Sequence, residues 1–434
     1  MASRIQRYLS KSPTYMLVLF ASIAAFSTYF CMYAFRKPFS VATFEGEAEI
    51  WGLNYKIFLV IAQVVGYMLS KFIGIKVVSE MQAQSRALAI VGLIGAAELA
   101  LLFFAITPSP WNAAFLFLNG IPLGMIWGIV FSYLEGRTVS EILAAGLSAS
   151  FIVASGAVKS VGDALMLHAG ISEFWMPFVT GLVFVIPLVI SVWLLEQIPP
   201  PSEKDRAERT PRKPMTGAER KALFLRFAPG IILLVAAYMM LTAFRDYRDN
   251  FAKEIWIALG YGDRPDIFTL SELPVAFGVL IIFGATFLIR KNFRAFMTFH
   301  VLIGSGILLV GLSTWAFQMG WLSPVWWMIL IGLGLYLGYV PFGCILFDRM
   351  IGAFQYSSNA GFLIYVADAF GYIGSVAILL YKNVGSPELS WLDFLIQAAY
   401  FMTFFGGALL IAGGLYFWRK HQAFQRQVEA VSTP

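Results

Sequence analysis

The stretch YFCMYAFR at residues 29–36 and the stretch YMMLTAFR at residues 238–245 repeat one pattern, in which Tyr, Ala, Phe and Arg coincide at an offset of 209 positions (245 − 36). The same offset joins two further pairs of polar side chains inside apolar segments, Lys159 with Asp368 and Gln63 with Glu272. Ionisable side chains are rare in such segments because each is costly to insert into a bilayer. Their recurrence at one offset predicts an internal repeat whose two copies run in the same direction through a membrane.

The composition restricts the chain to one class of protein. Of its 434 residues, 59% are hydrophobic and only 13% are charged, whereas soluble domains have roughly 45–50% apolar and about 25% charged residues. A disordered chain and a disulfide-rich secreted domain are excluded, since apolar residues dominate and there are only two cysteines. The net charge of +6 is explained by basic cytoplasmic loops rather than by a nucleic-acid partner. We therefore expect an all-α polytopic protein in a lipid bilayer.

Twelve apolar segments are long enough to cross a membrane as helices, which takes about 20 residues each. A β-barrel is not expected, because the alternating pattern is absent and the apolar runs are too long for barrel strands. The predicted spans are 14–43, 55–77, 86–106, 111–134, 141–168, 173–195, 224–250, 265–289, 295–317, 323–347, 358–381 and 392–418.

A proline run followed by charged residues divides the chain between the sixth and seventh spans. Pro199-Pro200-Pro201 and the charged stretch after it are typical of a solvated linker. The predicted organisation is an N-terminal six-helix bundle (1–196), a cytoplasmic linker (197–222) and a C-terminal six-helix bundle (223–434).

Lysine and arginine near the span ends predict that both termini are cytoplasmic. The loop after the seventh span is an exception, because Arg248, Lys253 and Arg264 alternate there with acidic residues on the opposite side. The first span has no small-residue cleavage site, which indicates a retained helix and a multi-pass protein of a bacterial inner membrane.

Arg36 and Arg245 stand at equivalent positions of the two repeats. A guanidinium presents a planar fork that binds phosphate or carboxylate oxygens in pairs and stays charged at every working pH. Two such forks, one from each half, are predicted to grip one multivalent anion. The alternative is that each arginine pairs with a neighbouring acid, with Asp246 and Glu272 as candidates for Arg245.

Two lysines inside the predicted spans have competing interpretations. Lys37 and Asp246 occupy matching places with opposite charge, which predicts a salt bridge between the halves. Lys159 is interpreted either as a third cationic contact to the ligand or as the partner of Asp163, one turn further along the same helix face.

The embedded acids allow coupling roles. Asp368 and Glu272 are candidates to bind protons, to balance the arginines, or both. Glu98 lies in a span that is usually peripheral in this architecture and is expected to form a local polar bond. No cluster of His, Cys and carboxylates has metal-ligand spacing, and no phosphate-binding loop or nucleophile motif is present, so neither a metal, a cofactor nor an enzyme reaction is expected.

Charges at two cytoplasmic span ends mirror one another. Glu135 and Arg137 follow the fourth span, and Asp348 and Arg349 follow the tenth. These four residues are predicted to lock the cytoplasmic gate when the halves close, the alternative being solvated helix ends that obey the positive-inside rule.

Short motifs in five spans occur in one order. They are Tyr29-x3-Tyr33-x2-Arg36-Lys37, Gly66-Tyr67-Met68-Leu69-Ser70-Lys71-Phe72, Gly124-Met125-Ile126-Trp127, Tyr339-Val340-Pro341 and Phe370-Gly371-Tyr372-Ile373-Gly374. In this order the sequence resembles the organophosphate:phosphate antiporter family of the major facilitator superfamily, which includes the glycerol-3-phosphate and hexose-phosphate transporters.

This resemblance implies the major facilitator fold and a substrate site between its halves. The site residues that it implies are Arg36, Arg245, Lys71, Tyr29, Tyr33, Trp127, Tyr339 and Tyr372. The sequence departs from the family where Lys159 replaces a histidine, where Thr242 replaces a tyrosine and where Asp368 adds an acid. The chain is therefore identified as a divergent member.

The predicted function is alternating-access transport of a small organic anion, a phosphorylated metabolite exchanged for inorganic phosphate, by a monomer. An empty site with two arginines would be costly to close, so closure is expected to require an anion and net flux is expected to be small. One alternative is proton-coupled symport of a carboxylate or sugar acid. Another is a sensor or scaffold that uses a transporter fold without transport.

Overall fold

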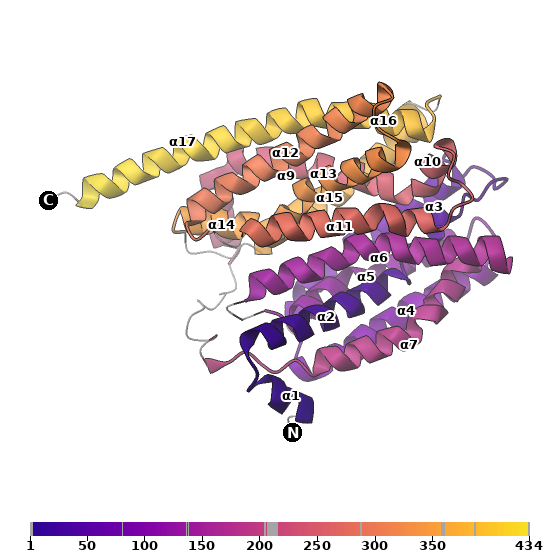
Figure 1. Ribbon diagram of the computed structural model, residues 1–434, viewed down its shortest axis with the longest axis horizontal. Coiled ribbons are helices and arrows are strands. Elements are labelled where there is room, and N and C mark those ends of the chain that lie inside the picture. Colours follow the sequence, from indigo (N-terminus) through magenta and orange to yellow (C-terminus); the bar gives the residue numbers. More distant parts are fainter. Residues whose placement is uncertain are drawn as a thin grey trace. The chain divides into compact units, whose positions relative to one another are not determined.

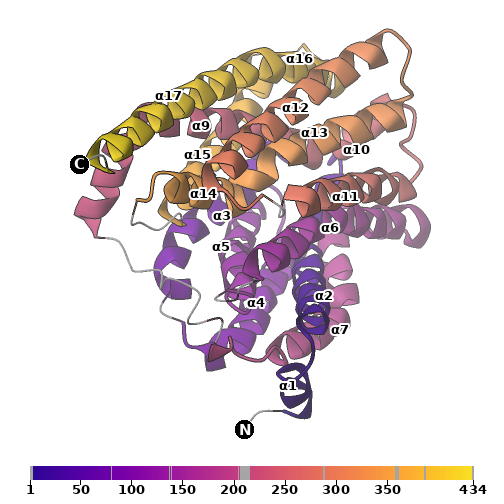
Figure 2. The same cartoon turned by 60° about the vertical axis from the view of Figure 1, so that its left-hand side comes forward.

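The computed structural model describes residues 3–79, 81–135, 137, 139–203, 205, 216–286, 289–356, 361–385 and 388–432. The regular secondary structure of these residues consists of helices. Figure 1 and Figure 2 show coiled ribbons without a strand arrow. The helices, in chain order, are α1 (Arg4–Leu9), α2 (Thr14–Tyr33), η1 (Pro38–Val41), α3 (Tyr55–Ser79), η2 (Ala83–Ser85), α4 (Arg86–Ile106), α5 (Ala113–Phe131), α6 (Ser140–Ala169), α7 (Met176–Glu196), α9 (Gly217–Asn250), α10 (Ala252–Ala258), α11 (Asp266–Thr286), α12 (Asn292–Gln318), α13 (Pro324–Cys344), α14 (Leu346–Ala353), α15 (Gly361–Leu380), η3 (Tyr381–Gly385), α16 (Trp391–Phe401), η4 (Met402–Gly406) and α17 (Gly407–Ser432).

Twelve segments of the described chain are long and apolar enough to cross a membrane. This count and the all-α class confirm the prediction of a multi-pass membrane protein. The spans lie at Thr14–Tyr33, Tyr55–Gly74, Ala83–Ile106, Ala113–Phe131, Ile142–Ala169, Met176–Glu196, Gly217–Asn250, Asp266–Thr286, Asn292–Gln318, Pro324–Gly343, Gly361–Gly385 and Trp391–Gln427.

The first span is shorter than predicted, because α2 ends at Tyr33 rather than near residue 43. Pro38 has no N–H and cannot continue the helical hydrogen bonds of the preceding turn. The backbone tightens before it, with the N–H groups of Arg36 and Lys37 both donating to the Tyr33 carbonyl oxygen (3.1 and 2.9 Å). The chain then resumes as the short 3-10 helix η1. Arg36 therefore lies in a break between two helical segments.

The chain forms two compact units, which are described separately. Unit 1 comprises residues 1–210, 247–280 and 376–394, and unit 2 comprises 211–246, 281–375 and 395–434. Unit 1 thus combines the first six spans with pieces of the second six. The predicted division of the sequence into two six-helix bundles stays a prediction, and residues 204 and 206–215 of the predicted linker lie outside the described residues.

Glycines allow helices of unit 1 to approach closely. A Cβ atom on Gly120 of α5 would lie 2.4 Å from the carbonyl oxygen of Gln63 on α3. At Gly156 of α6, an added Cβ would lie 2.4 Å from the carbonyl oxygen of Phe268 on α11. Small residues at helix contacts let backbones come together in membranes. Polar side chains of neighbouring helices are thereby brought within hydrogen-bonding distance.

Unit 2 has a similar glycine contact and an aromatic cluster. Gly306 of α12 and Gly334 of α13 face each other so closely that a Cβ on either would lie 2.5 Å from the carbonyl oxygen of the other. The rings of Phe227, Phe354 and Phe417 pack with centroid distances of 5.0 to 6.4 Å. Through Phe227, this cluster packs α9 against the segment after α14 and against α17.

Candidate functional site

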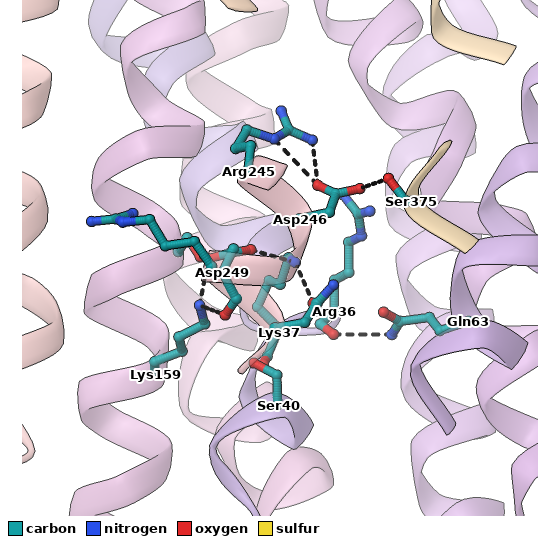
Figure 3. A network of polar contacts seen from close by, with 12 residues as sticks. Arg36, Lys37, Ser40, Gln63, Lys159, Arg245, Asp246, Asp249 and Ser375 are labelled. Atoms are coloured by element: carbon teal, nitrogen blue, oxygen red, sulfur yellow. Dashed lines mark hydrogen bonds and ion pairs between the residues drawn. The ribbon is translucent and has the colours of Figure 1, made fainter. Parts of the chain in front are cut away.

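A carboxylate held by two lysines forms part of the polar network in unit 1 (Figure 3). Asp249, in the last turn of α9, forms ion pairs with Lys37 and with Lys159 of α6. It also accepts a hydrogen bond from the hydroxyl group of Ser155. The lysine side chains are only 6% and 3% exposed, and that of Asp249 is 14% exposed. Opposite charges attract strongly in such a dry location, where a single charge would be costly.

In the described part of unit 1, residues 247–258 take part in three further ion pairs. They are Lys56–Glu254, Lys253–Asp163 (2.7 Å) and Arg248–Glu272 (2.8 Å). Burial raises the pKa of the Glu254 carboxyl group above its usual range, and the attraction of its lysine partner only partly offsets this shift. The first two pairs, like those of Asp249, join residues 247–258 to residues of the first six spans.

Sequence reasoning missed Asp249, Lys56 and Glu254 as site residues. The available signal was the alternation of charges after the seventh span, which departs from the positive-inside rule. We assigned that alternation to a loop. In the structure, α9 continues to Asn250 and α10 begins at Ala252. The charges therefore lie on helices, at positions that face lysines from elsewhere in unit 1.

One predicted charge partner was wrong. Lys159 pairs with Asp249 and not with Asp163, because the end of α9 brings a carboxylate directly to its ammonium group, while Lys253 of α10 binds Asp163. Glu272 accepts from Arg248 within unit 1. Its predicted pairing with Arg245, which belongs to unit 2, stays a prediction.

Lys37 has a carboxylate partner that we did not predict, Asp249, and it also donates to the side chain of Asn250 (2.9 Å). The predicted bridge between Lys37 and Asp246 would join the two units and stays a prediction.

Arg36 lies among tyrosine rings in unit 1. Its guanidinium carbon is 3.7 Å from the ring centroid of Tyr67 and 6.0 Å from that of Tyr33. Tyr29 and Tyr33 meet edge to face, with centroids 5.6 Å apart. Lys71 Nζ lies 5.2 Å from the Tyr67 centroid. A guanidinium stacked on a ring keeps its N–H groups in the plane where an anion binds, so Tyr67 joins the candidate site as a residue that the prediction omitted.

Arg245 is bound to a carboxylate within unit 2 (Figure 3). Its Nε and Nη2 atoms donate to Oδ1 of Asp246 (3.2 and 2.6 Å), which confirms Asp246 as its partner. The other carboxylate oxygen of Asp246 accepts from the hydroxyl group of Ser375 (2.7 Å). The guanidinium carbon lies 3.8 Å from the ring centroid of Tyr339. Each of the two repeated arginines thus stacks on a tyrosine.

Two predicted site residues of unit 2, Tyr339 and Asp368, contact Tyr238. Tyr238 donates from its hydroxyl group to Oδ1 of Asp368 (2.7 Å), and its ring stacks on Tyr339 with centroids 5.2 Å apart. Tyr372 is buried. In unit 1, the predicted apolar wall residue Trp127 stacks on Phe131 at 5.0 Å.

Both arginines of the predicted cytoplasmic gate donate a hydrogen bond to another segment of their own unit. Arg137 is 2% exposed and donates to the Pro199 carbonyl oxygen, so it is not a solvated helix end, and burial lowers its pKa. Arg349 donates to the side-chain oxygen of Asn292 (3.0 Å). The gating role of these arginines, and of Glu135 and Asp348, stays a prediction.

Glu98 does not form the local polar bond that we expected. Both of its carboxylate oxygens are buried without a hydrogen-bond partner in the described part of the chain. They lie against Gly181 of α7, where a Cβ atom would come within 2.1 Å of Oε2. Among the described residues, no group of three or more His, Cys, Asp and Glu side chains is placed to hold a metal ion.

The twelve spans define a helical membrane protein, and its fold is similar to that of a solved transporter. Among the 208 matching chains of solved structures is the crystal structure of a D-xylose-proton symporter. It is 13% identical in sequence, has a TM-score of 0.55, and the match covers 94% of this chain and 98% of that chain. No curated protein matches the sequence. The chain belongs to DUF5690, a family of unknown function whose model matches residues 38–420.

Proposed function

We propose that this protein is a secondary transporter of a small organic anion. The observation that carries the proposal is the pair of buried lysines, Lys37 and Lys159, on the carboxylate of Asp249. Membrane-embedded ionisable groups mark substrate or ion pathways by default. Here two ammonium groups bind a carboxylate of the protein itself. The same two groups could bind the carboxylate or phosphate of an anionic substrate.

The anion is, in this proposal, a phosphorylated metabolite that is exchanged for inorganic phosphate by alternating access. Arg36 and Arg245 bind its charged head, and Lys159 and Lys71 assist. The stacking of Arg36 on Tyr67 and of Arg245 on Tyr339 supports this assignment, since it fixes each guanidinium plane. Fixed orientation reduces the entropy that is lost when an anion binds.

The tyrosines and Trp127 give the proposed site its shape. Sites for small molecules combine a few polar anchors with apolar and aromatic walls. Tyr29 and Tyr33 in unit 1, and Tyr339 and Tyr372 in unit 2, supply hydroxyl groups and ring faces for the organic part of the substrate. During alternating access, the ion pairs formed by residues 247–258 would separate when the transporter opens to the non-cytoplasmic side.

A second candidate is proton-coupled symport of a carboxylate or sugar acid. Two observations favour it: the D-xylose-proton symporter shares the fold, and Asp368 accepts a hydrogen bond from Tyr238 in unit 2. An acid inside a membrane span is a common member of the proton relays of transporters. Neutralising Asp368 would then abolish uphill uptake while exchange continues.

The deciding experiment is exchange in proteoliposomes loaded with unlabelled phosphate and supplied with labelled phosphate outside. Wild type is compared with Arg36→Ala, Arg245→Ala and the matched control Arg264→Ala, which removes an exposed arginine that pairs with Asp266 outside the candidate site. Uptake that is kept in the control and lost in the other two variants supports phosphate exchange. Absence of uptake by folded wild type refutes it, and a pH gradient with carboxylate substrates then tests symport.

A further inference from the structure

The backbone around Arg36 lacks the regular hydrogen bonds of a helix. α2 ends at Tyr33, and Pro38 removes an N–H group that a continuing helix would use. A carbonyl group that loses its helical donor inside a membrane must find another, because an unsatisfied backbone group in an apolar medium is costly. The break therefore needs donors from neighbouring helices.

Two amide side chains supply these donors. Asn119 of α5 donates from Nδ2 to the carbonyl oxygen of Phe35 (2.9 Å) and to that of Ala97 on α4 (3.0 Å). Gln63 of α3 donates from Nε2 to the carbonyl oxygen of Arg36 itself (3.0 Å), a contact visible in Figure 3, and to Oδ1 of Asn119 (2.9 Å). The two amides thus form one connected group that binds two consecutive carbonyls of the break.

This group is buried and closely confined. Asn119 is 0% exposed and Gln63 is 3% exposed. Gly120, the next residue on α5, lets that helix approach α3 so closely that a Cβ would meet the Gln63 carbonyl oxygen at 2.4 Å. The glycine contact therefore sets the distance over which the two amides bind each other.

The second repeat lacks this arrangement. Arg245 lies inside the continuous helix α9, so its carbonyl group is not at a helix break. At the 209-residue offset, the counterparts of Gln63 and Asn119 are Glu272 and Met328. Glu272 accepts from Arg248, and a methionine side chain has no N–H to donate. The amide pair thus accompanies the helix break, and the equivalent positions of the second repeat, both of which the structure describes, hold no amide.

We infer that Asn119 and Gln63 are positioning residues for Arg36: they hold the break between α2 and η1 so that the guanidinium is presented to the anion in a fixed place. This inference rests on the proposed function for its consequence, because Arg36 is the residue that binds the anion. Its structural content, that the two amides hold residues 34–41, does not depend on any ligand.

The ligand-independent test is backbone hydrogen exchange in purified, detergent-solubilised protein. Asn119→Leu keeps a similar volume and removes the donors, and Gln63→Met does the same on α3. Thr28→Val is the matched control, since it removes a buried hydrogen bond to Ala24 within α2 but leaves the break intact. We expect at least tenfold faster exchange at residues 34–41 in both amide variants, with exchange in α12 unchanged, and no such change in the control.

The functional test uses inorganic phosphate as the probe. We expect Asn119→Leu to raise the phosphate KM for exchange by about tenfold, with less than a twofold change in the maximal rate, and Asn119→Ser, which keeps a smaller polar group, to recover part of the affinity. In an Arg36→Lys background the same substitution should have no further effect on KM, because the residue through which it acts is already altered.

The outcomes separate the inference from the proposed function. One outcome is that wild type fails to transport phosphate while backbone hydrogen exchange at residues 34–41 still becomes faster in the amide variants. In that case the proposed ligand is wrong and the positioning role stands. Wild-type protection that persists in both amide variants overturns the inference. So does an increase in KM that is the same in the Arg36→Lys background, because the amides would then act independently of the arginine.

Discussion

Replacing Asp249 with asparagine removes the carboxylate that two buried lysines share. Lys37 and Lys159 would then lie close together without their common counter-charge. Both side chains are almost completely buried, so their two positive charges would be poorly solvated. The substitution is expected to destabilise the protein and to leave a site that is ready for an external anion.

The sizes of both effects can be bounded. Breaking a buried ion pair by removing one partner costs about 3–5 kcal/mol. An anion that binds the two lysines at 100 times its Kd would return about 2.7 kcal/mol. In wild type the same anion must first displace Asp249, so its affinity is lower. We therefore expect Asp249→Asn to melt at a lower temperature than wild type without phosphate, and to bind phosphate at least tenfold more tightly.

The assay is thermal unfolding of the detergent-solubilised protein over a series of phosphate concentrations at constant ionic strength. The matched control is Glu254→Gln, which removes a carboxylate from Lys56 on a neighbouring helix and leaves both lysines of Asp249 paired. The control should lose stability without a gain in phosphate affinity. A phosphate response of Asp249→Asn that does not exceed those of wild type and control would refute the idea that Asp249 occupies an anion site.

Three further outcomes are expected. Gly156→Ala should lower the melting temperature by an amount equivalent to about 1–3 kcal/mol, since its Cβ would overlap a backbone oxygen of α11, whereas Gly95→Ala, with no atom within 4 Å of its Cβ, should be neutral or slightly stabilising; equal shifts would contradict the close contact. Because the pKa of Glu254 is raised in the folded state, the folded protein binds more protons, and wild-type stability should fall relative to Glu254→Gln as pH rises from about 4.3 to that raised pKa; parallel melting curves from pH 4 to 8 would argue against the shift. Arg245→Lys keeps the charge but loses the planar fork and the stacked ring, so the initial rate of phosphate uptake should fall at least tenfold; an unchanged rate would leave no role for the fork.

The spans could be predicted because a bilayer imposes a length and a composition on each helix. Where a helix ends depends on single prolines and on hydrogen bonds from other helices, and hydropathy reports neither. α2 ends ten residues before the predicted limit of its span, since Pro38 and two amides from other helices favour a break among residues that are otherwise apolar. By contrast, α9 ends at Asn250, as predicted. It carries four charged residues in its last turns, because Arg245 and Asp246 pair with each other while Arg248 and Asp249 pair with other residues of unit 1.

The candidate site was predictable as a set of residues but not as a set of pairs. A buried charge is visible in a sequence because its cost requires a reason. Its partner depends on which helices are neighbours and on how far each continues, and neither follows from spacing along one helix. Lys159 illustrates this: spacing pointed to Asp163, whereas the helix arrangement supplied Asp249, 90 positions away.

The paired carboxylates lower the cost of closing the empty site. We expected an empty site to resist closure because unpaired arginines would be costly to bury. In unit 2, Asp246 neutralises Arg245, and in unit 1 Asp249 offsets one of the two positive charges of Lys37 and Lys159. The charge that an empty site must bury is therefore smaller than the arginines and lysines alone would give. To bind, the substrate must displace a carboxylate of the protein. Its affinity is set by the difference between the free energy with which the cations bind the substrate and that with which they bind the carboxylate. A dianionic phosphate has an advantage in that competition, because two lysines and an arginine can each engage a separate oxygen, whereas the aspartate offers a single charge and is held at the end of a helix.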